Sequence, residues 1–288
     1  MPETRPSAWP DSPLADFSLG VGGKDVRDLE RARAVIPPGT RVHMGFLDSE
    51  DHETRLATAR AVRGLGFVPV PLIAARRLES EVMLRGFLAG LRAAGASESV
   101  QVVAGDPAQP RGPYADSASV IGSGVLEEYG VRQVSVAGHP GGHPAVANDV
   151  LWSALAGKTA ALARRGLAGG VSTQFGFDAD VVLAWLTELR ARGISLPVRV
   201  GVPGPTGVRR LLAYASRCGV SVSEGVAREY GFSLTDPSGT AGPDRFIRAL
   251  ASGYDARRHG EVKLHFYPFG GIAATAAWIS EFREHSGS

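Results

Sequence analysis

Apolar and polar positions follow one another along the chain in blocks that predict strands followed by helices. In the stretch 169–178, apolar Val171 leads into the polar pair Thr173 and Gln174, two aromatic residues follow, and a run with helical spacing begins at Asp178. This pattern predicts a strand, a short turn and a helix capped by the Asp178 side chain. Side chains at the C-terminal end of a parallel strand face the ligand, so Thr173 and Gln174 are candidates to contact one.

Seven further blocks repeat this order, and the helix of the first block extends to about residue 193. Strands are predicted at 16–21, 41–46, 67–73, 100–104, 133–137, 197–202 and 262–267, and helices at 25–35, 50–65, 78–93, 115–129, 145–165, 178–193, 206–217 and 271–284. Eight strand-then-helix units predict a single (β/α)8 TIM barrel of the α/β class, with a doubly wound open sheet as the alternative. Residues 1–14 hold four prolines and predict a loose arm, which assigns 15–288 to the barrel. The segment 220–254 is longer than one connection, and the stretch 236–243 within it has the composition of a loop.

Length, charge and cysteine content limit the kinds of partner and site that the chain can have. The chain has 288 residues, is 44% hydrophobic and 21% charged, and carries a formal net charge of +2. Acids and bases are mixed along it, so we expect a small-molecule partner and neither nucleic acid nor membrane. Its single cysteine, Cys218, excludes an internal disulfide and a cysteine-based zinc cluster. We find no membrane-length apolar run and no signal-peptide core, which predicts a cytoplasmic protein; a homo-oligomer is compatible with the sequence.

Polar groups follow several predicted strands. Asp106, next to Gly105, offers an acceptor at the barrel rim, with a helix-capping turn as the alternative. His139 and His143 lie in a loop rich in Pro and Gly rather than on a helix face, which favours hydrogen bonds to a ligand or to the loop over a metal site. Tyr114 is placed either to stack on a flat ligand or to pack against the rim.

Other features narrow the chemistry. The pairs Arg76-Arg77 and Arg164-Arg165 are typical of solvated helix ends, which the helix dipole favours. The sequence contains no P-loop, no Gly-x-Gly-x-x-Gly after the first strand and no Gly-x-Ser-x-Gly elbow. The residues by themselves therefore predict a barrel with a polar mouth that binds a small, flat ligand.

Taken together, the motifs resemble those of the methylenetetrahydrofolate reductase family. The resemblance extends from about residue 16 to 282 and rests on Ala104-Gly105-Asp106, Tyr114-Ala115, Gly138-His139-Pro140, His143-Pro144, Thr173-Gln174-Phe175, Phe177-Asp178 and His265-Phe266-Tyr267. It implies a (β/α)8 barrel, tetrahydrofolate as the one-carbon substrate, NADH or NADPH as the redox partner, and usually FAD.

The resemblance also implies residue roles. It makes Asp106 and Gln174 catalytic, with Gln174 on the pterin and Asp106 beside the flavin and the folate. The implied substrate-binding residues are Gln174, Thr173, Phe177 and Tyr267. The implied cofactor-binding residues are His43, Gly105, Asp106, Tyr114, Ala115, His139 and His143, and no metal is expected.

The sequence departs from the family at the proton donor. Gly20 stands where the family's first strand carries a glutamate, and general acid catalysis typically contributes about 10²–10⁴-fold. Acids that could replace it follow the second strand: Asp48, Glu50, Asp51 and Glu53. The alternative is that they form the acidic first turn of a helix. Ala104 replaces the arginine of the family's Arg-Gly-Asp, which leaves a flavin-independent reaction open.

The main hypothesis is an atypical folate-dependent oxidoreductase that interconverts 5,10-methylenetetrahydrofolate and 5-methyltetrahydrofolate with a nicotinamide cofactor. The alternative is a tetrahydrofolate-binding or methyl-group-handling barrel protein without reductase activity. A third hypothesis is a barrel enzyme that acts on an unrelated flat substrate.

Overall fold

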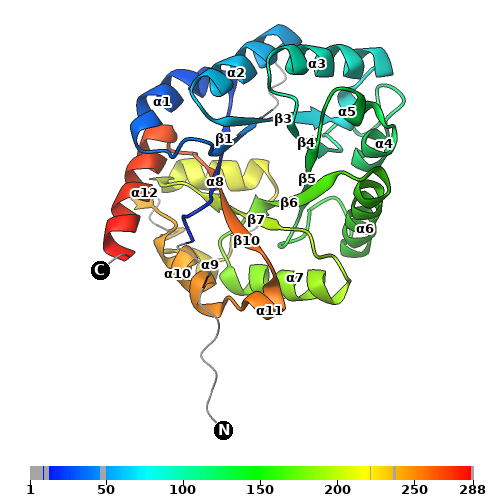
Figure 1. The fold of residues 1–288 in the computed structure, drawn as a ribbon. Helices are drawn as coiled ribbons and strands as arrows, with labels where there is room; N and C mark the ends of the chain where they lie inside the picture. Colours follow the sequence, from blue (N-terminus) through cyan, green and yellow to red (C-terminus); the bar gives the residue numbers. More distant parts are fainter. Residues whose placement is uncertain (1–8, 10–12, 46–49, 221, 236–237, 287–288) are drawn as a thin grey trace. The chain divides into compact units, whose positions relative to one another are not determined.

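Eight parallel strands close into a barrel in the order β1-β10-β7-β6-β5-β4-β3-β2 (Figure 1). The computed structural model describes residues 9, 13–45, 50–220, 222–235 and 238–286. The predicted (β/α)8 TIM barrel is confirmed, and the open sheet is wrong. The chain divides into an N-terminal unit, Ser18–Gly138 with Asp149–Ser172, and a C-terminal unit, Met1–Phe17 with His139–Asn148 and Thr173–Ser288. The predicted boundary between arm and barrel, at residue 15, stays a prediction.

The N-terminal unit carries the first five strands and their helices. The strands are β1 (Ser18–Val21), β2 (Arg41–Met44), β3 (Val68–Ala74), β4 (Ser99–Val103) and β5 (Gln133–Gly138). The helices are η1 (Gly23–Asp25), α1 (Val26–Arg31), η2 (Ala32–Ala34), α2 (His52–Gly64), η3 (Ala75–Arg77), α3 (Glu81–Ala93), α4 (Ser117–Gly122), α5 (Val125–Glu128) and α6 (Asn148–Arg165). Helix α2 packs against both α3 and β3 (Figure 1).

Local sequence explains where these helices begin and break. Helix α3 buries Leu84, Leu88 and Leu91 on one face, and the Ser80 hydroxyl caps it by accepting a hydrogen bond from Met83 N at 3.1 Å. The single helix predicted at 115–129 is two short helices, because Gly124 adopts a left-handed φ of 84° between them. The helix predicted at 25–35 is likewise broken, into η1, α1 and η2.

The C-terminal unit carries the remaining elements. Strand β6 (Ala168–Phe175) ends in it, and β7 (Val198–Pro203), β8 (Thr206–Gly207), β9 (Thr240–Ala241) and β10 (Val262–Tyr267) follow. Its helices are α7 (Ala179–Ala191), α8 (Val208–Arg217), α9 (Glu224–Tyr230), α10 (Asp244–Gly253), α11 (Ala256–His259) and α12 (Ile272–Ser286). Strands β7 and β10 pair in parallel, whereas β8 and β9 form a small antiparallel sheet.

The segment 220–254 contains two helices that its length alone did not predict. Helix α10 packs on α7 and buries Phe246, Ile247 and Leu250 at helical spacing. Helix α9 is held to the end of β7 by a 3.2 Å hydrogen bond from the Tyr230 hydroxyl to the Pro203 carbonyl. The stretch with a loop composition, 236–243, lies between the two helices; its described residues, 238–243, hold turns and the two-residue strand β9.

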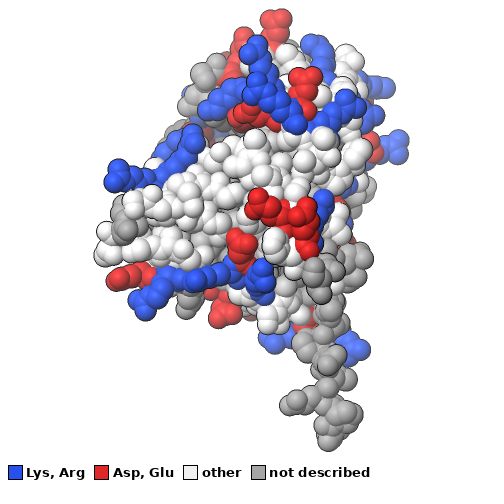
Figure 2. Space-filling model, turned by 90° about the vertical axis from the view of Figure 1, so that its left-hand side faces the viewer, with Lys and Arg blue, Asp and Glu red and all other residues white. Residues whose placement is uncertain are grey.

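Charges of both signs are mixed on the surface. On the face that Figure 2 shows, Lys and Arg side chains are interspersed with Asp and Glu. Each helix in the described ranges is too short or too polar to cross a lipid bilayer. Most of the predicted loose arm, 1–14, lies outside the described residues; Trp9 is described, and its ring lies 4.5 Å from that of Tyr254. The cytoplasmic location and a homo-oligomer stay predictions.

Strand β7 approaches β6 closely at Gly201. A Cβ atom at this position would lie 2.7 Å from both Phe175 N and Thr173 O. A methyl carbon cannot come this close to non-bonded backbone atoms. The Gly201 amide also donates a 2.8 Å hydrogen bond to Thr173 Oγ1. Glycine is therefore required here by the spacing of two strands.

We expect Gly201→Ala to lower the free energy of unfolding by about 1–3 kcal/mol or more, because the added methyl must push β6 and β7 apart. The control is Gly157→Ala in α6, where a Cβ meets no atom within 4 Å and alanine should stabilise the helix by up to about 1 kcal/mol. Urea unfolding followed by circular dichroism measures both. Equal stabilities for the two variants would contradict the close approach.

Candidate functional site

The C-terminal unit contains a cavity of about 410 Å³ beside the end of β6. Its volume lies within the range of small-molecule sites. Five segments line it: His139, Pro140, Gly141, Gly142, His143 and Asn148; Gln174, Phe175, Gly176, Phe177 and Asp178; Val181 and Val182; Cys218, Gly219 and Val220; and Ser223 and Val226. Of the predicted site residues, the structure brings Gln174, Phe177, His139 and His143 together around this cavity.

Gln174 presents a fixed amide to the cavity. Its Oε1 accepts a hydrogen bond from Phe175 N at 3.1 Å, which sets the plane of the amide group. Within the described residues, no protein group accepts a hydrogen bond from its Nε2. The side chain therefore offers two N–H donors and one further acceptor lone pair to a ligand.

Thr173 and Tyr267 lie behind Gln174 rather than in the cavity lining. The Thr173 hydroxyl accepts from Gly201 N at 2.8 Å and donates to the Gln174 carbonyl at 2.9 Å. The Tyr267 hydroxyl donates to the Thr173 carbonyl at 3.0 Å, and burial of this hydroxyl raises the pKa of Tyr267. The residue Tyr267 is only half-buried as a whole, but its hydroxyl lies in the interior. These two residues hold the strand that carries Gln174.

Aromatic rings form an apolar cluster beside the cavity. Phe175 contacts Phe177 edge-on, with ring centroids 5.9 Å apart, and Phe269 at 4.9 Å. Phe177 in turn meets Tyr230 of α9 at 5.0 Å with an interplanar angle of 85°. Edge-to-face packing of this kind fixes ring orientations. The cavity therefore has a rigid apolar wall next to a polar amide.

The loop 139–147 supplies the two histidines. Their rings meet edge-on with centroids 5.5 Å apart, and His143 Nδ1 accepts a hydrogen bond from Ala145 N at 3.2 Å. In the neutral ring, His143 Nε2 therefore carries the proton. A Cβ on Gly219 would lie 2.3 Å from Pro144, so glycine at the end of α8 lets this loop pack against it. Among the described residues, no three His, Cys, Asp or Glu side chains converge as a metal site would require.

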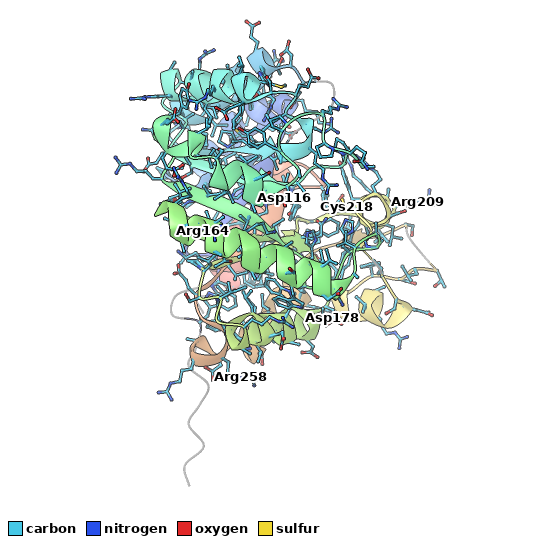
Figure 3. The ribbon with its side chains drawn as sticks, turned by 90° about the vertical axis from the view of Figure 1, so that its right-hand side faces the viewer. Asp116, Arg164, Asp178, Arg209, Cys218 and Arg258 are labelled. Carbon is cyan, nitrogen blue, oxygen red and sulfur yellow. The ribbon has the colours of Figure 1, made fainter. Side chains whose placement is uncertain are left out.

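Asp178 and Cys218 complete the polar lining (Figure 3). Asp178 Oδ1 accepts hydrogen bonds from Asp180 N and Val181 N, which confirms the predicted cap of α7. Burial raises the pKa of the Cys218 thiol, so it is protonated at neutral pH and is a poor nucleophile. The cavity is thus equipped for binding by hydrogen bonds and ring contacts rather than for thiolate chemistry. Sequence reasoning missed Asn148, Phe175, Cys218 and Val226 as lining residues.

The remaining predicted site residues belong to the N-terminal unit, and several are engaged there. Asp106 forms a two-pronged ion pair with Arg77, at 2.8 Å and 2.6 Å, and this guanidinium lowers the pKa of Asp106. The Arg77 side chain is only 13% exposed. Arg76 donates to the carbonyls of Ala115 and Pro107. The expectation that Arg76 and Arg77 are solvated helix ends is wrong.

The other residues of this set have structural partners. His43 is buried, with Nδ1 2.9 Å from Gln101 Oε1. Tyr114 is 4% exposed and packs in the core, with its hydroxyl 3.4 Å from Glu81 Oε2. Gly105 adopts a φ of 91°, which makes it a turn residue beside Asp106. Of the two roles considered for Tyr114, packing is the one its burial favours.

Two of the acids considered as substitutes for Gly20, Glu50 and Asp51, hydrogen-bond to nearby backbone. Asp51 Oδ1 accepts from Thr54 N at 2.8 Å and caps α2, and Glu50 Oε1 accepts from Gly23 N at 3.0 Å. Asp48 lies outside the described residues. The acidic first turn is therefore the better of the two interpretations for Asp51.

Lys158 is a half-buried residue, with a largely desolvated ammonium group, that no pattern in the sequence singles out. Its ammonium group donates to the Ala137 carbonyl, at the end of β5, at 2.8 Å. Burial lowers its pKa to about 8, against a weaker opposing effect of Asp116. The burial of ionised Lys158 at neutral pH therefore lowers the free energy of unfolding.

The chain resembles solved structures of two dihydropteroate synthases at low sequence identity. No family model matches the chain. Dihydropteroate synthase from Thermus thermophilus is 18% identical, with a TM-score of 0.47 over 93% of this chain and 93% of that one. Dihydropteroate synthase from Burkholderia cenocepacia is 16% identical, with a TM-score of 0.48 over 95% and 93%. At these values the likeness carries no inference about activity.

These findings contradict the resemblance to methylenetetrahydrofolate reductases. No family model matches the chain and the solved structures found are named as dihydropteroate synthases, so the predicted family is wrong. The oxidoreductase activity, FAD and the nicotinamide cofactor were implied by that family alone and are withdrawn with it. The physical reason is that (β/α)8 barrels gather their ligand-contacting residues at the strand ends, in chain order, whatever their chemistry. Short motifs at those positions therefore match in order and spacing without sharing a reaction.

We expect Tyr267→Phe to lower the free energy of unfolding by about 1 kcal/mol, because it removes the donor to the Thr173 carbonyl. Tyr214→Phe is the matched control: both tyrosines stack on Phe269, but no described residue hydrogen-bonds the Tyr214 hydroxyl. Chemical denaturation of both variants tests this. If both variants lower the free energy of unfolding equally, the hydrogen bond from Tyr267 to the Thr173 carbonyl does not stabilise β6.

Lys158→Met should change stability in a pH-dependent way. Below about pH 8 native Lys158 is charged and its burial costs stability; between pH 8 and 10.5 the unfolded chain binds more protons, so the wild type gains stability as pH rises. The advantage of the methionine variant should thus shrink by about 3 kcal/mol across this window. Unfolding of each protein at several pH values measures it, with exposed Lys24→Met as the control. A difference that does not vary with pH would contradict the lowered pKa.

Proposed function

We propose that this protein is a (β/α)8 barrel that binds a small, flat heterocycle of the pterin or tetrahydrofolate class in the Gln174 cavity, without a reductase step. The observation that carries the proposal is the Gln174 amide, oriented by the Phe175 amide and directed at a cavity of about 410 Å³. This is the folate-binding alternative considered from the sequence. The contact of Gln174 with the pterin was there implied only by the family resemblance and is here proposed from the geometry of the cavity.

The chemistry of the lining supports this ligand class. The pyrimidine edge of a pterin alternates hydrogen-bond donors and acceptors in one plane, and a side-chain amide offers both. Phe175 and Phe177 supply an apolar surface against which a flat ring can lie. His139, His143 and Asn148 add polar groups at the loop side of the cavity. In this proposal Thr173 and Tyr267 position Gln174 and do not themselves touch the ligand.

Gln174→Leu should weaken binding of tetrahydrofolate about 10- to 100-fold, because it removes the amide's hydrogen bonds while keeping a side chain of similar size. Isothermal titration calorimetry with tetrahydrofolate and with 5-methyltetrahydrofolate measures the effect. The control is Gln109→Leu, an exposed position outside the cavity.

Two results would count against the proposal. The first is the absence of any binding of either folate to the wild-type protein. The second is binding that Gln174→Leu leaves unchanged, which would place the ligand elsewhere on the chain.

A further inference from the structure

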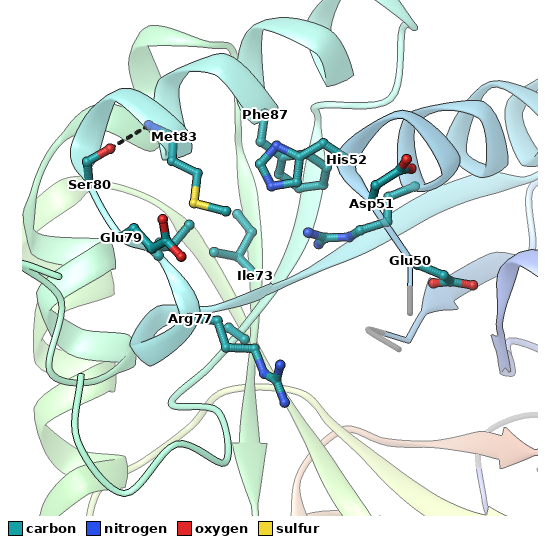
Figure 4. Close-up of a pocket in the computed structure, with 12 residues that line it drawn as sticks. Glu50, Asp51, His52, Ile73, Arg77, Glu79, Ser80, Met83 and Phe87 are labelled. Carbon is teal, nitrogen blue, oxygen red and sulfur yellow. Dashed lines mark hydrogen bonds between the residues drawn. The ribbon is translucent and has the colours of Figure 1, made fainter. Parts of the chain in front are cut away.

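The N-terminal unit holds a second cavity, of about 490 Å³, between the start of α2, the end of β3 and the start of α3 (Figure 4). It shares no lining residue with the Gln174 cavity. Its residues are Glu50, Asp51, His52, Arg55, Ile73, Ala74, Arg77, Leu78, Glu79, Ser80, Met83 and Phe87. Its volume suits a small molecule.

The floor of this cavity is apolar. Ile73 and Phe87 are 1% and 2% exposed, and Figure 4 shows Ile73 and Met83 directed into the space between α2 and α3. The His52 ring lies against Phe87 with centroids 5.2 Å apart. Burial lowers the pKa of His52, which keeps the imidazole neutral at neutral pH. A ligand here would rest its apolar part on Ile73, Met83 and Phe87.

The two cations of the lining are already engaged within the protein. Arg55 lies 4.1 Å above the Phe87 ring and donates to the Leu72 carbonyl. The Arg77 guanidinium donates two hydrogen bonds to the Asp106 carboxylate in a bidentate ion pair. An anionic ligand would have to displace these partners, which makes an anion a poor occupant.

Acceptors are available instead. The Glu79 carboxylate has no hydrogen-bond or ion-pair partner among the described residues, and Figure 4 shows it across the cavity from His52 and Asp51. Asp51 caps α2 through Oδ1 alone. The cavity therefore pairs an apolar floor with a carboxylate at its rim.

We propose that this cavity is a binding site for a small organic cation, with an ammonium or amidinium head on Glu79 and an apolar body on the Ile73, Met83 and Phe87 floor. The positive charge of the ligand's ammonium or amidinium group complements the Glu79 carboxylate. The apolar part of the ligand occupies the cavity beside Arg55 and Arg77, which keep their partners within the protein. This site is separate from the proposed folate function and does not depend on it.

Benzamidine, benzamide and benzoate test the proposal, because they share a ring and differ in charge. In calorimetric titrations of the full chain, benzamidine should bind at least tenfold more tightly than neutral benzamide, and benzoate should not bind. Equal binding of benzamidine and benzamide, or preferred binding of benzoate, would overturn the assignment.

Variants locate the site. Glu79→Gln should weaken benzamidine binding at least tenfold and leave benzamide binding unchanged, whereas Glu53→Gln, an exposed carboxylate in the first turn of α2 that is outside the cavity, should change neither. Gln174→Leu should also leave benzamidine binding unchanged, so that failure of this site and failure of the folate proposal are distinguishable. Benzamidine affinity that survives Glu79→Gln, or that falls with Gln174→Leu, would overturn the proposal.

Discussion

The hydroxyl of Thr173 ties together the strand ends on which the candidate site depends. It lies in the interior, at 1% exposure, where an unpaired polar group is costly, and it is paired on both sides: it accepts from Gly201 and donates to the Gln174 carbonyl. The Thr173 carbonyl is in turn held by Tyr267 of β10. Because each partner would be left unpaired if a strand slipped, the register of β6, β7 and β10 is fixed.

The hydrogen bonds of Thr173 also fix the position of Gln174, the next residue in β6. Its backbone is held through Thr173 and its amide through Phe175, so little of the side chain's freedom remains to be lost when a ligand binds. The rings of Phe175 and Phe177 are fixed by their own edge contacts, and the close approach of Pro144 to Gly219 seats the histidine loop. Binding specificity would then come from groups that are in place before the ligand arrives.

The barrel could be predicted from hydrophobic spacing because its strands are short apolar runs, several of them buried on both faces, and most of its helices bury one face. No helix was predicted within 220–254, because α9 and α10 are short and are stabilised by tertiary contacts, such as that of Tyr230 with Pro203, which local spacing does not report. Gln174, His139 and His143 could be found by the strand-end rule, whereas Phe177 was implied only by the family resemblance. Their neighbours Cys218 and Val226 could not be found, because they reach the cavity from helix ends far away in the chain.

Charge pairing was the other weakness of sequence reasoning. Nothing in the spacing of Arg77 and Asp106 predicts their ion pair, which turns an expected rim acceptor and an expected solvated cation into partners. The family resemblance was wrong because short motifs at strand ends are typical of the barrel fold and do not identify the reaction that a barrel catalyses.

The most direct test of the account is an amide NMR titration of the isotopically labelled protein with tetrahydrofolate. The Phe175 amide, which donates to Gln174 Oε1, should shift together with those of Gly176 and Gly219 as the ligand meets the amide. Saturable shifts confined to other parts of the chain, or no shifts at all, would contradict a pterin site at Gln174.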